Sequence, residues 1–137
     1  MREIKFKAKR HDNGEWVYGN LIIEDDECYI STGFPEIALD DDYWANSYGY
    51  PPSSSDFHIT NIHEVIPETV GQFTGLKDKN GVKIFEGDIF QYSKHNGYML
   101  PDFTGAVLFR MGSFGYVPTS ENIGEAFTSF SEIDELQ

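Results

Sequence analysis

The residue types that suit acid–base chemistry occur together at Glu86 and Asp88, which flank Gly87. Two carboxylates in one cleft repel each other, and this repulsion separates their pKa values so that one serves as acid and the other as base. No pattern typical of substrate binding accompanies the pair, and turn aspartates commonly accept hydrogen bonds from backbone amides. We therefore expect Asp88 to cap a turn. We predict no catalytic residues and no enzyme activity.

The histidines and clustered carboxylates lack the spacing of a metal site. His58 and His63 are five residues apart in a segment with strand-like alternation, where such positions point to opposite faces. The aspartates at 40–42 also point in alternate directions on an extended chain. Residues 78–81 end in a glycine that comes too early for a calcium loop, so they indicate a hairpin turn. We predict neither a metal nor another cofactor.

Length and composition limit the class of protein. With 137 residues, the chain is long enough to form one domain with its own hydrophobic core. Its single cysteine, Cys28, has no partner for an intramolecular disulfide, which indicates a buried thiol in a reducing cytoplasm. No apolar run is long enough to cross a bilayer, and the charged N-terminus is unlike a signal peptide. We therefore expect no membrane association.

The charge is large and unevenly distributed. The formal net charge is −13, from 23 acidic and 10 basic residues, so we expect the surface to repel nucleic-acid backbones. Half of the cations lie within residues 2–10, and acidic groups gather at 24–27 and 40–42. The basic segment has two candidate counterparts: the acidic rim of a second subunit, or an acidic hairpin of its own chain.

Alternation of apolar and polar residues predicts a mainly β protein of the β-rich α+β class. Ile4, Phe6 and Ala8 alternate with lysines, which is typical of a half-buried strand. Asn80 and Gly81 predict a type I′ hairpin turn, because these residues tolerate positive φ. Short strands bounded by turn residues favour a small bent sheet or elements of an SH3-like barrel. The predicted strands are residues 3–9, 15–23, 28–31, 57–66, the two sides of a hairpin over 70–85, 89–93, 106–110 and 114–117.

Two segments depart from this alternation. Residues 33–57 contain prolines, serines and aromatic residues without a clear period. They predict a long irregular excursion that crosses the surface or reaches a partner as an arm.

Near the C-terminus, apolar spacing favours a short helix over 121–130, with a final strand over 127–133 as the alternative. We divide the single domain, residues 1–137, into four parts: an N-terminal meander (2–32), the excursion (33–57), a small-barrel part (58–118) and a C-terminal element (119–137).

Three stretches carry a family resemblance. They are residues 2–6, the turn and strand of 14–19, and residues 68–89, where Val-Gly-Gln-Phe-Thr-Gly-Leu-Lys-Asp-Lys-Asn-Gly is followed by Glu-Gly-Asp. These stretches resemble the YopX family of phage and prophage proteins, although the chain departs from the usual ending of that family. The resemblance implies a small, mostly β protein of the bacterial cytoplasm, encoded by a phage or prophage. It implies no catalytic residues.

The sequence thus favours a phage or prophage accessory protein that is a non-enzymatic protein-binding or self-assembling module. Tyrosine and tryptophan dominate the energetics of many interfaces, and residues 33–57 contain three tyrosines and one tryptophan. The expected partners are a second copy of the chain or a host or phage protein, but neither nucleic acid nor a membrane. The alternative function is an acidic mimic of nucleic acid that inhibits a host DNA-binding protein.

Overall fold

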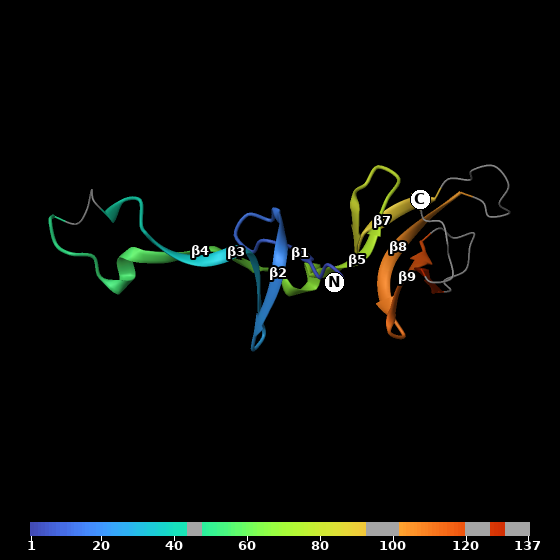
Figure 1. Ribbon diagram of the computed structural model, residues 1–137, viewed down its shortest axis with the longest axis horizontal. Helices are drawn as coiled ribbons and strands as arrows, with labels where there is room; N and C mark the ends of the chain where they lie inside the picture. The colour runs from blue at the N-terminus through green and yellow to red at the C-terminus, as the bar shows by residue number, and fades with distance from the viewer. Residues whose placement is uncertain (44–47, 93–101, 120–126, 131–137) are drawn as a thin grey trace.

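The computed structural model describes residues 1–43, 48–92, 102–119 and 127–130, which form a mainly β protein with two antiparallel sheets (Figure 1). The first sheet has the strand order β4-β3-β2-β1-β5-β6, and the second has the order β10-β9-β8-β7. The strands of the first sheet are β1 (Phe6–Lys9), β2 (Trp16–Glu24), β3 (Glu27–Leu39), β4 (Phe57–Val65), β5 (Gly71–Lys77) and β6 (Lys83–Phe85). The strands of the second are β7 (Ile89–Tyr92), β8 (Phe103–Arg110), β9 (Ser113–Pro118) and β10 (Thr128–Ser129). The short 3-10 helices η1 (Ser54–Asp56) and η2 (Pro67–Thr69) precede and follow β4.

Strands β1 and β2 show the predicted alternation. Ala8 lies opposite Val17 and is completely buried, so this side of the pair faces the core. On the other side, Lys7 lies opposite Tyr18, and Lys9 lies opposite Trp16. The predicted half-buried strand is therefore confirmed over residues 6–9, whereas Ile4 lies before it and is 58% exposed.

The core of the first sheet forms where β1, β3 and β4 meet. Ala8, Ile30 and Val65 are its most buried members. Partly buried side chains surround them: Phe6, Val17, Leu21, Cys28 and Val70. A Cβ at Gly19 would lie 2.0 Å from the carbonyl oxygen of Ser31. Glycine therefore allows β2 and β3 to approach closely beside this core.

The second sheet has a core of stacked and edge-on rings. Phe90 meets Tyr116 edge to face with 5.3 Å between ring centroids, and Tyr116 stacks on Phe103 at 5.4 Å. Val107 beside them is completely buried. Aromatic pairs in these geometries stabilise a core in addition to the stabilisation that comes from burying their apolar area.

The turn between β6 and β7 joins the two sheets. The N–H of Gly87 donates to the carbonyl of Val107, and the N–H of Val107 donates to the carbonyl of Asp88, both at 2.9 Å. The Asp88 carboxylate accepts the Phe85 N–H at 2.9 Å and also pairs with the Lys7 ammonium. The prediction that Asp88 caps this turn is confirmed.

The hairpin between β5 and β6 is present, but its predicted turn type is wrong. Gly81 has a φ of 81°, whereas Asn80 does not have the positive φ that a type I′ turn requires. Instead, the Asp78 carboxylate accepts the N–H groups of Asn80 and Val82 at 2.8 and 2.9 Å. This side-chain acceptor stabilises a turn in which only the last position needs positive φ.

The predicted irregular excursion and small barrel also need correction. Strand β3 continues to Leu39, and its residues 36–39 pair with residues 57–60 of β4, so this part of the predicted excursion is regular. Strand β4 belongs to the first sheet, and the described residues form no closed barrel.

The predicted helix over residues 121–130 is wrong in its described part. Thr128 and Ser129 form β10 and pair with Tyr116 and Gly115 of β9. Pairing with an existing strand edge therefore decides the conformation here, rather than the apolar spacing. Residues 121–126 and 131–137 of the two alternatives lie outside the described residues.

Candidate binding surface

The outer parts of β3 and β4 form a two-stranded projection. We call this projection, together with the described residues of its tip, the arm (residues 33–43 and 48–61). The arm extends away from the other strands at one end of the long axis (Figure 1). The pairing of β3 with β2 ends at Ser31, and the contact of β4 with the rest of the chain ends near the bridge from Arg10 to Val65. Among the described residues, both edges of the arm therefore lack a neighbouring strand.

One side of the arm is apolar and the other is polar. Ile37 lies opposite Ile59, and Leu39 lies opposite Phe57. Directly opposed residues share one side of a sheet, so these four side chains form a continuous apolar face of the arm. Ile37 is 76% exposed and Ile59 is 59% exposed. The opposite side carries two further pairs: Glu36 with Thr60, and Ala38 with His58.

A bulge separates the arm from the core of the first sheet. The register between β3 and β4 shifts between Ser31 and Glu36. On the facing strand, Asn61 has a φ of 62°, and its amide donates to the carbonyl of Phe34 at 3.0 Å. Bulges bend a strand and change the direction of its side chains. The Phe34 side chain at this bend is 90% exposed.

The tip of the arm is held together by polar contacts. The N–H of Asp40 donates to the carbonyl of Asp56 at 2.8 Å, and the Asp40 carboxylate contacts the His58 ring at 2.7 Å. Hydrogen bonds from the backbone and hydroxyl of Ser53 lower the pKa of Asp56. A hollow of about 510 Å³ at the tip is lined by Asp40, Asp42, Tyr43, Tyr50, Pro51, Ser53 and Asp56. Its carboxylates and aromatic rings suit a cationic group.

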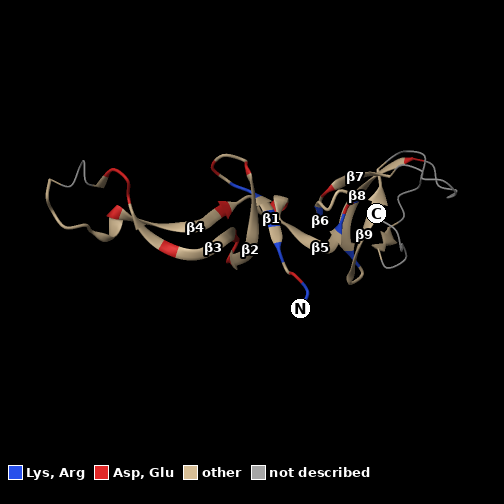
Figure 2. Cartoon of the chain, turned by 45° about the horizontal axis from the view of Figure 1, so that its top comes forward, with Lys and Arg blue, Asp and Glu red and all other residues tan. Residues whose placement is uncertain are grey.

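The arm is acidic and contains neither lysine nor arginine. No lysine or arginine occurs between Arg10 and Lys77 in the sequence. Figure 2 accordingly shows acidic but no basic positions along the outer parts of β3 and β4. The acidic residues of the arm are Glu36, Asp40, Asp41, Asp42 and Asp56. The apolar face is thus attached to a negatively charged tip.

The outward side of β1 and β2 combines lysines with aromatic rings. We call Lys7, Lys9, Trp16 and Tyr18 the Trp16–Tyr18 face. The Lys7 and Lys9 ammonium groups lie 4.5 and 5.4 Å from the centre of the Trp16 ring, distances typical of cation–π contacts. Trp16 is 43% exposed and Tyr18 is 46% exposed. The two rings of this face are therefore accessible. Lys7 is only 12% exposed and pairs with Asp88, so Lys9 supplies the positive charge that this face offers to a partner.

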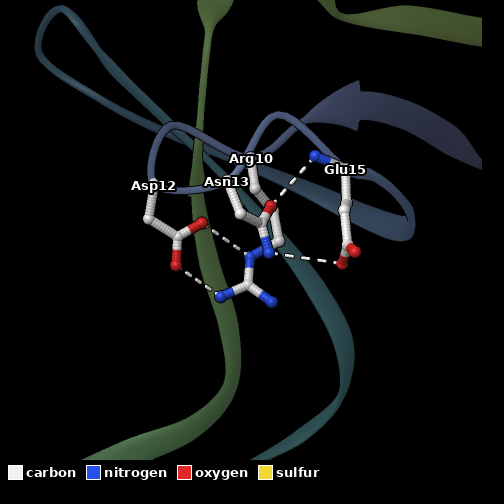
Figure 3. A network of polar contacts seen from close by, with 4 residues as sticks. All are labelled: Arg10, Asp12, Asn13 and Glu15. Atoms are coloured by element: carbon white, nitrogen blue, oxygen red, sulfur yellow. Dashed lines mark hydrogen bonds and ion pairs between the residues drawn. The ribbon is translucent and has the colours of Figure 1, made fainter.

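A polar network fixes the turn that joins β1 to β2 (Figure 3). The Arg10 guanidinium donates two hydrogen bonds to Asp12, at 2.9 and 2.5 Å, and these bonds lower the pKa of Asp12. Asn13 accepts the N–H of Glu15 at 2.9 Å and donates to its carboxylate at 3.2 Å. These contacts set the hairpin geometry and so orient Trp16.

Two cations of the basic N-terminal segment form ion pairs with acidic residues of the same chain. Arg10 pairs with Asp12, and Lys7 pairs with Asp88. Neither acidic partner belongs to the 24–27 hairpin, so that expected intramolecular pairing is not found for these two cations. Among the described residues, Lys9 forms no ion pair.

Glu86 and Asp88, the pair weighed for acid–base chemistry, lie in the turn between β6 and β7. The N–H of Glu86 donates to the carbonyl of Gln72, whereas the Asp88 carboxylate is engaged with Lys7 and the Phe85 amide. His63 lies opposite the core residue Ile30. Within the ranges that the structure describes, no group of three His, Cys, Asp or Glu side chains is placed to hold a metal ion.

Cys28 and Tyr29 are neighbouring residues of β3. Cys28 is half-buried and packs against the core of the first sheet. Tyr29, which the sequence did not single out, donates a hydrogen bond to Glu27, and this bond raises the pKa of Tyr29 to about 12. Ile37 was also missed, although it alternates with Leu39 in the way that Ile59 alternates with Phe57.

The fold and the surface define a small two-sheet β protein with a projecting hairpin. The YopX protein family matches residues 5–135, so the chain belongs to the YopX family. No curated protein matches the chain. A crystal structure of protein EF1440 from Enterococcus faecalis is similar, with 23% sequence identity and a TM-score of 0.49 over 98% of this chain and 88% of that chain. No helix among the described residues has the length and apolarity needed to span a membrane.

Proposed function

We propose that this YopX-family chain is a non-enzymatic protein-binding or self-assembling module, and that the arm is its binding element. In this proposal it is a phage or prophage accessory protein of the bacterial cytoplasm. The supporting observation is the apolar face of the arm, where Ile37 and Ile59 lie opposite each other and remain largely exposed. Contiguous exposed apolar side chains rimmed by polar residues are typical of interaction sites.

The strand pairing of the arm gives a second reason for a partner. An isolated two-stranded hairpin is only marginally stable in water, because neither strand is supported on its outer edge. The arm has this arrangement within the described residues. A bound protein would cover the apolar face and supply hydrogen-bonding groups to a free edge. Binding would therefore stabilise the arm itself.

The test replaces both isoleucines of the apolar face with threonine, in the variant Ile37→Thr with Ile59→Thr. Threonine favours strands and leaves an opposed pair, but it removes the apolar surface. We expect the variant to bind at least about tenfold more weakly than the wild type, as loss of central apolar anchors commonly does. The measurement is sedimentation velocity of the fluorescently labelled protein, in buffer and in a bacterial cell extract.

The matched control is Glu36→Thr, which creates the same threonine pair with Thr60 on the polar side of the arm. The control and the wild type should sediment at the same rate, and in at least one medium this rate should exceed that of a monomer. The double variant should sediment as a monomer in both media. Identical sedimentation of wild type and double variant in both media would refute a binding role for the arm.

A further inference from the structure

The arm and the Trp16–Tyr18 face have complementary chemistry within one chain. The arm presents an apolar face beside a tip that contains only acidic charged groups, apart from histidine. The Trp16–Tyr18 face presents exposed rings beside lysines. Apolar contact at the centre with opposite charges around it is the usual arrangement of a specific interface.

Resting on the proposed function, we infer that the arm of one copy binds the Trp16–Tyr18 face of a second copy. The apolar face of the arm covers Trp16 and Tyr18. The carboxylates of the tip then lie toward Lys9 of β1, which forms no ion pair with described residues of its own chain. The contact joins two different surfaces, so each copy uses its arm once and its Trp16–Tyr18 face once.

Contact between two arms is disfavoured by charge. Each arm carries five acidic residues and neither lysine nor arginine, so a symmetric pair would bring carboxylates together without compensating cations. Like-charge contacts across an interface are costly. Nucleic acid and anionic lipid surfaces are disfavoured on the arm for the same reason. A copy of the same chain, by contrast, supplies a basic and aromatic surface.

Because the contact joins two different surfaces, two variants that each lack a different surface should associate with each other when they are mixed. A variant with a defective arm, Ile37→Thr with Ile59→Thr, retains its Trp16–Tyr18 face. A variant with a defective face, Lys9→Glu with Trp16→Thr, retains its arm. Neither should associate with itself, but an equal mixture contains one intact pair of surfaces. We therefore expect each variant alone to have the mass of a monomer and the mixture to have the mass of one heterodimer.

The experiment is light scattering of purified full-length protein at low and high salt. The wild type should exceed the monomer mass at low salt and lose mass at high salt, since salt screens the charged rim. A mixture that stays monomeric while the wild type associates would overturn the inference, as would a wild type that is monomeric at every concentration. In the latter case, faster sedimentation of the wild type in extract would leave the proposed function standing.

A single substitution keeps the test decisive if the face variant does not fold. Lys9→Glu alone changes one half-buried lysine and leaves Trp16 in place. It should raise the dissociation constant of self-association several-fold at low salt and have less effect at high salt. An unchanged constant in both conditions would exclude the Trp16–Tyr18 face as the receiving surface.

Discussion

Ile30→Ala is expected to lower the free energy of unfolding by about 3 kcal/mol, because it leaves a cavity in a packed core. Ile30 is fully buried beside Ala8 and Val65, where β1, β3 and β4 converge. A loss of this size is a large fraction of the stability of a typical domain. Urea unfolding in dilute protein, followed by fluorescence, measures it.

The matched control lies on the same strand. Ile37 is 76% exposed on the arm, so Ile37→Ala should change the unfolding free energy of the dilute protein by no more than about 0.5 kcal/mol. The same chemical change on one strand thus separates a core position from a binding position. Equal losses for the two variants would show that the arm is part of the folded core and would argue against its role as a free surface.

Asp88→Ala should produce the second large loss of stability, about 2 kcal/mol, because charged hydrogen bonds contribute more than neutral ones. The Asp88 carboxylate accepts the Phe85 N–H and pairs with Lys7, whose side chain is only 12% exposed. Removing it leaves a nearly buried ammonium without its counter-charge at the junction of the two sheets. Urea unfolding again gives the magnitude.

Asp88→Asn separates the two contributions of this carboxylate. The asparagine amide oxygen retains an acceptor for the Phe85 N–H but removes the negative charge beside Lys7. Its loss of stability should therefore lie between those of the wild type and Asp88→Ala. If Asp88→Ala were as stable as the wild type, the turn between β6 and β7 would not depend on this cap.

The sequence predicted the parts of the fold that local patterns determine. Phe6 and Ala8 identified the first strand and its buried side, whereas Ile4 lies before β1 and is 58% exposed. The turn residues between the short strands located most of the later strands. The turn at Asn80 shows the limit of this reasoning, because the carboxylate of Asp78 changed the turn type. Side-chain acceptors of this kind compete with the backbone pattern.

The arm was harder to predict because its pairing is nonlocal. Leu39 pairs with Phe57 across a tip that contains acidic, serine and proline residues, and Gly33 and Pro35 interrupt the alternation at the bulge. The C-terminal strand was missed for a related reason. Phe127 and Phe130 fit a helical period, but the edge of β9 provides hydrogen-bonding partners for Thr128 and Ser129.

The binding surface could be predicted only in outline. The aromatic and acidic composition of residues 33–57 suggested an arm that reaches a partner. The register of Ile37 with Ile59 was needed to show that the apolar side chains share one side. Likewise, the opposition of Lys9 and Trp16 on neighbouring strands combines residues that the sequence treated separately.

The most direct test of this account is amide hydrogen exchange of the arm in dilute and concentrated wild-type protein. Free arm amides should exchange rapidly in the dilute protein, since the hairpin has few supporting contacts. At high concentration, the amides of residues 36–39 and 57–60 should become protected, while those around Ile30 and Val65 remain unchanged. Equal exchange of the arm at both concentrations would contradict the conclusion that a second copy covers its apolar face.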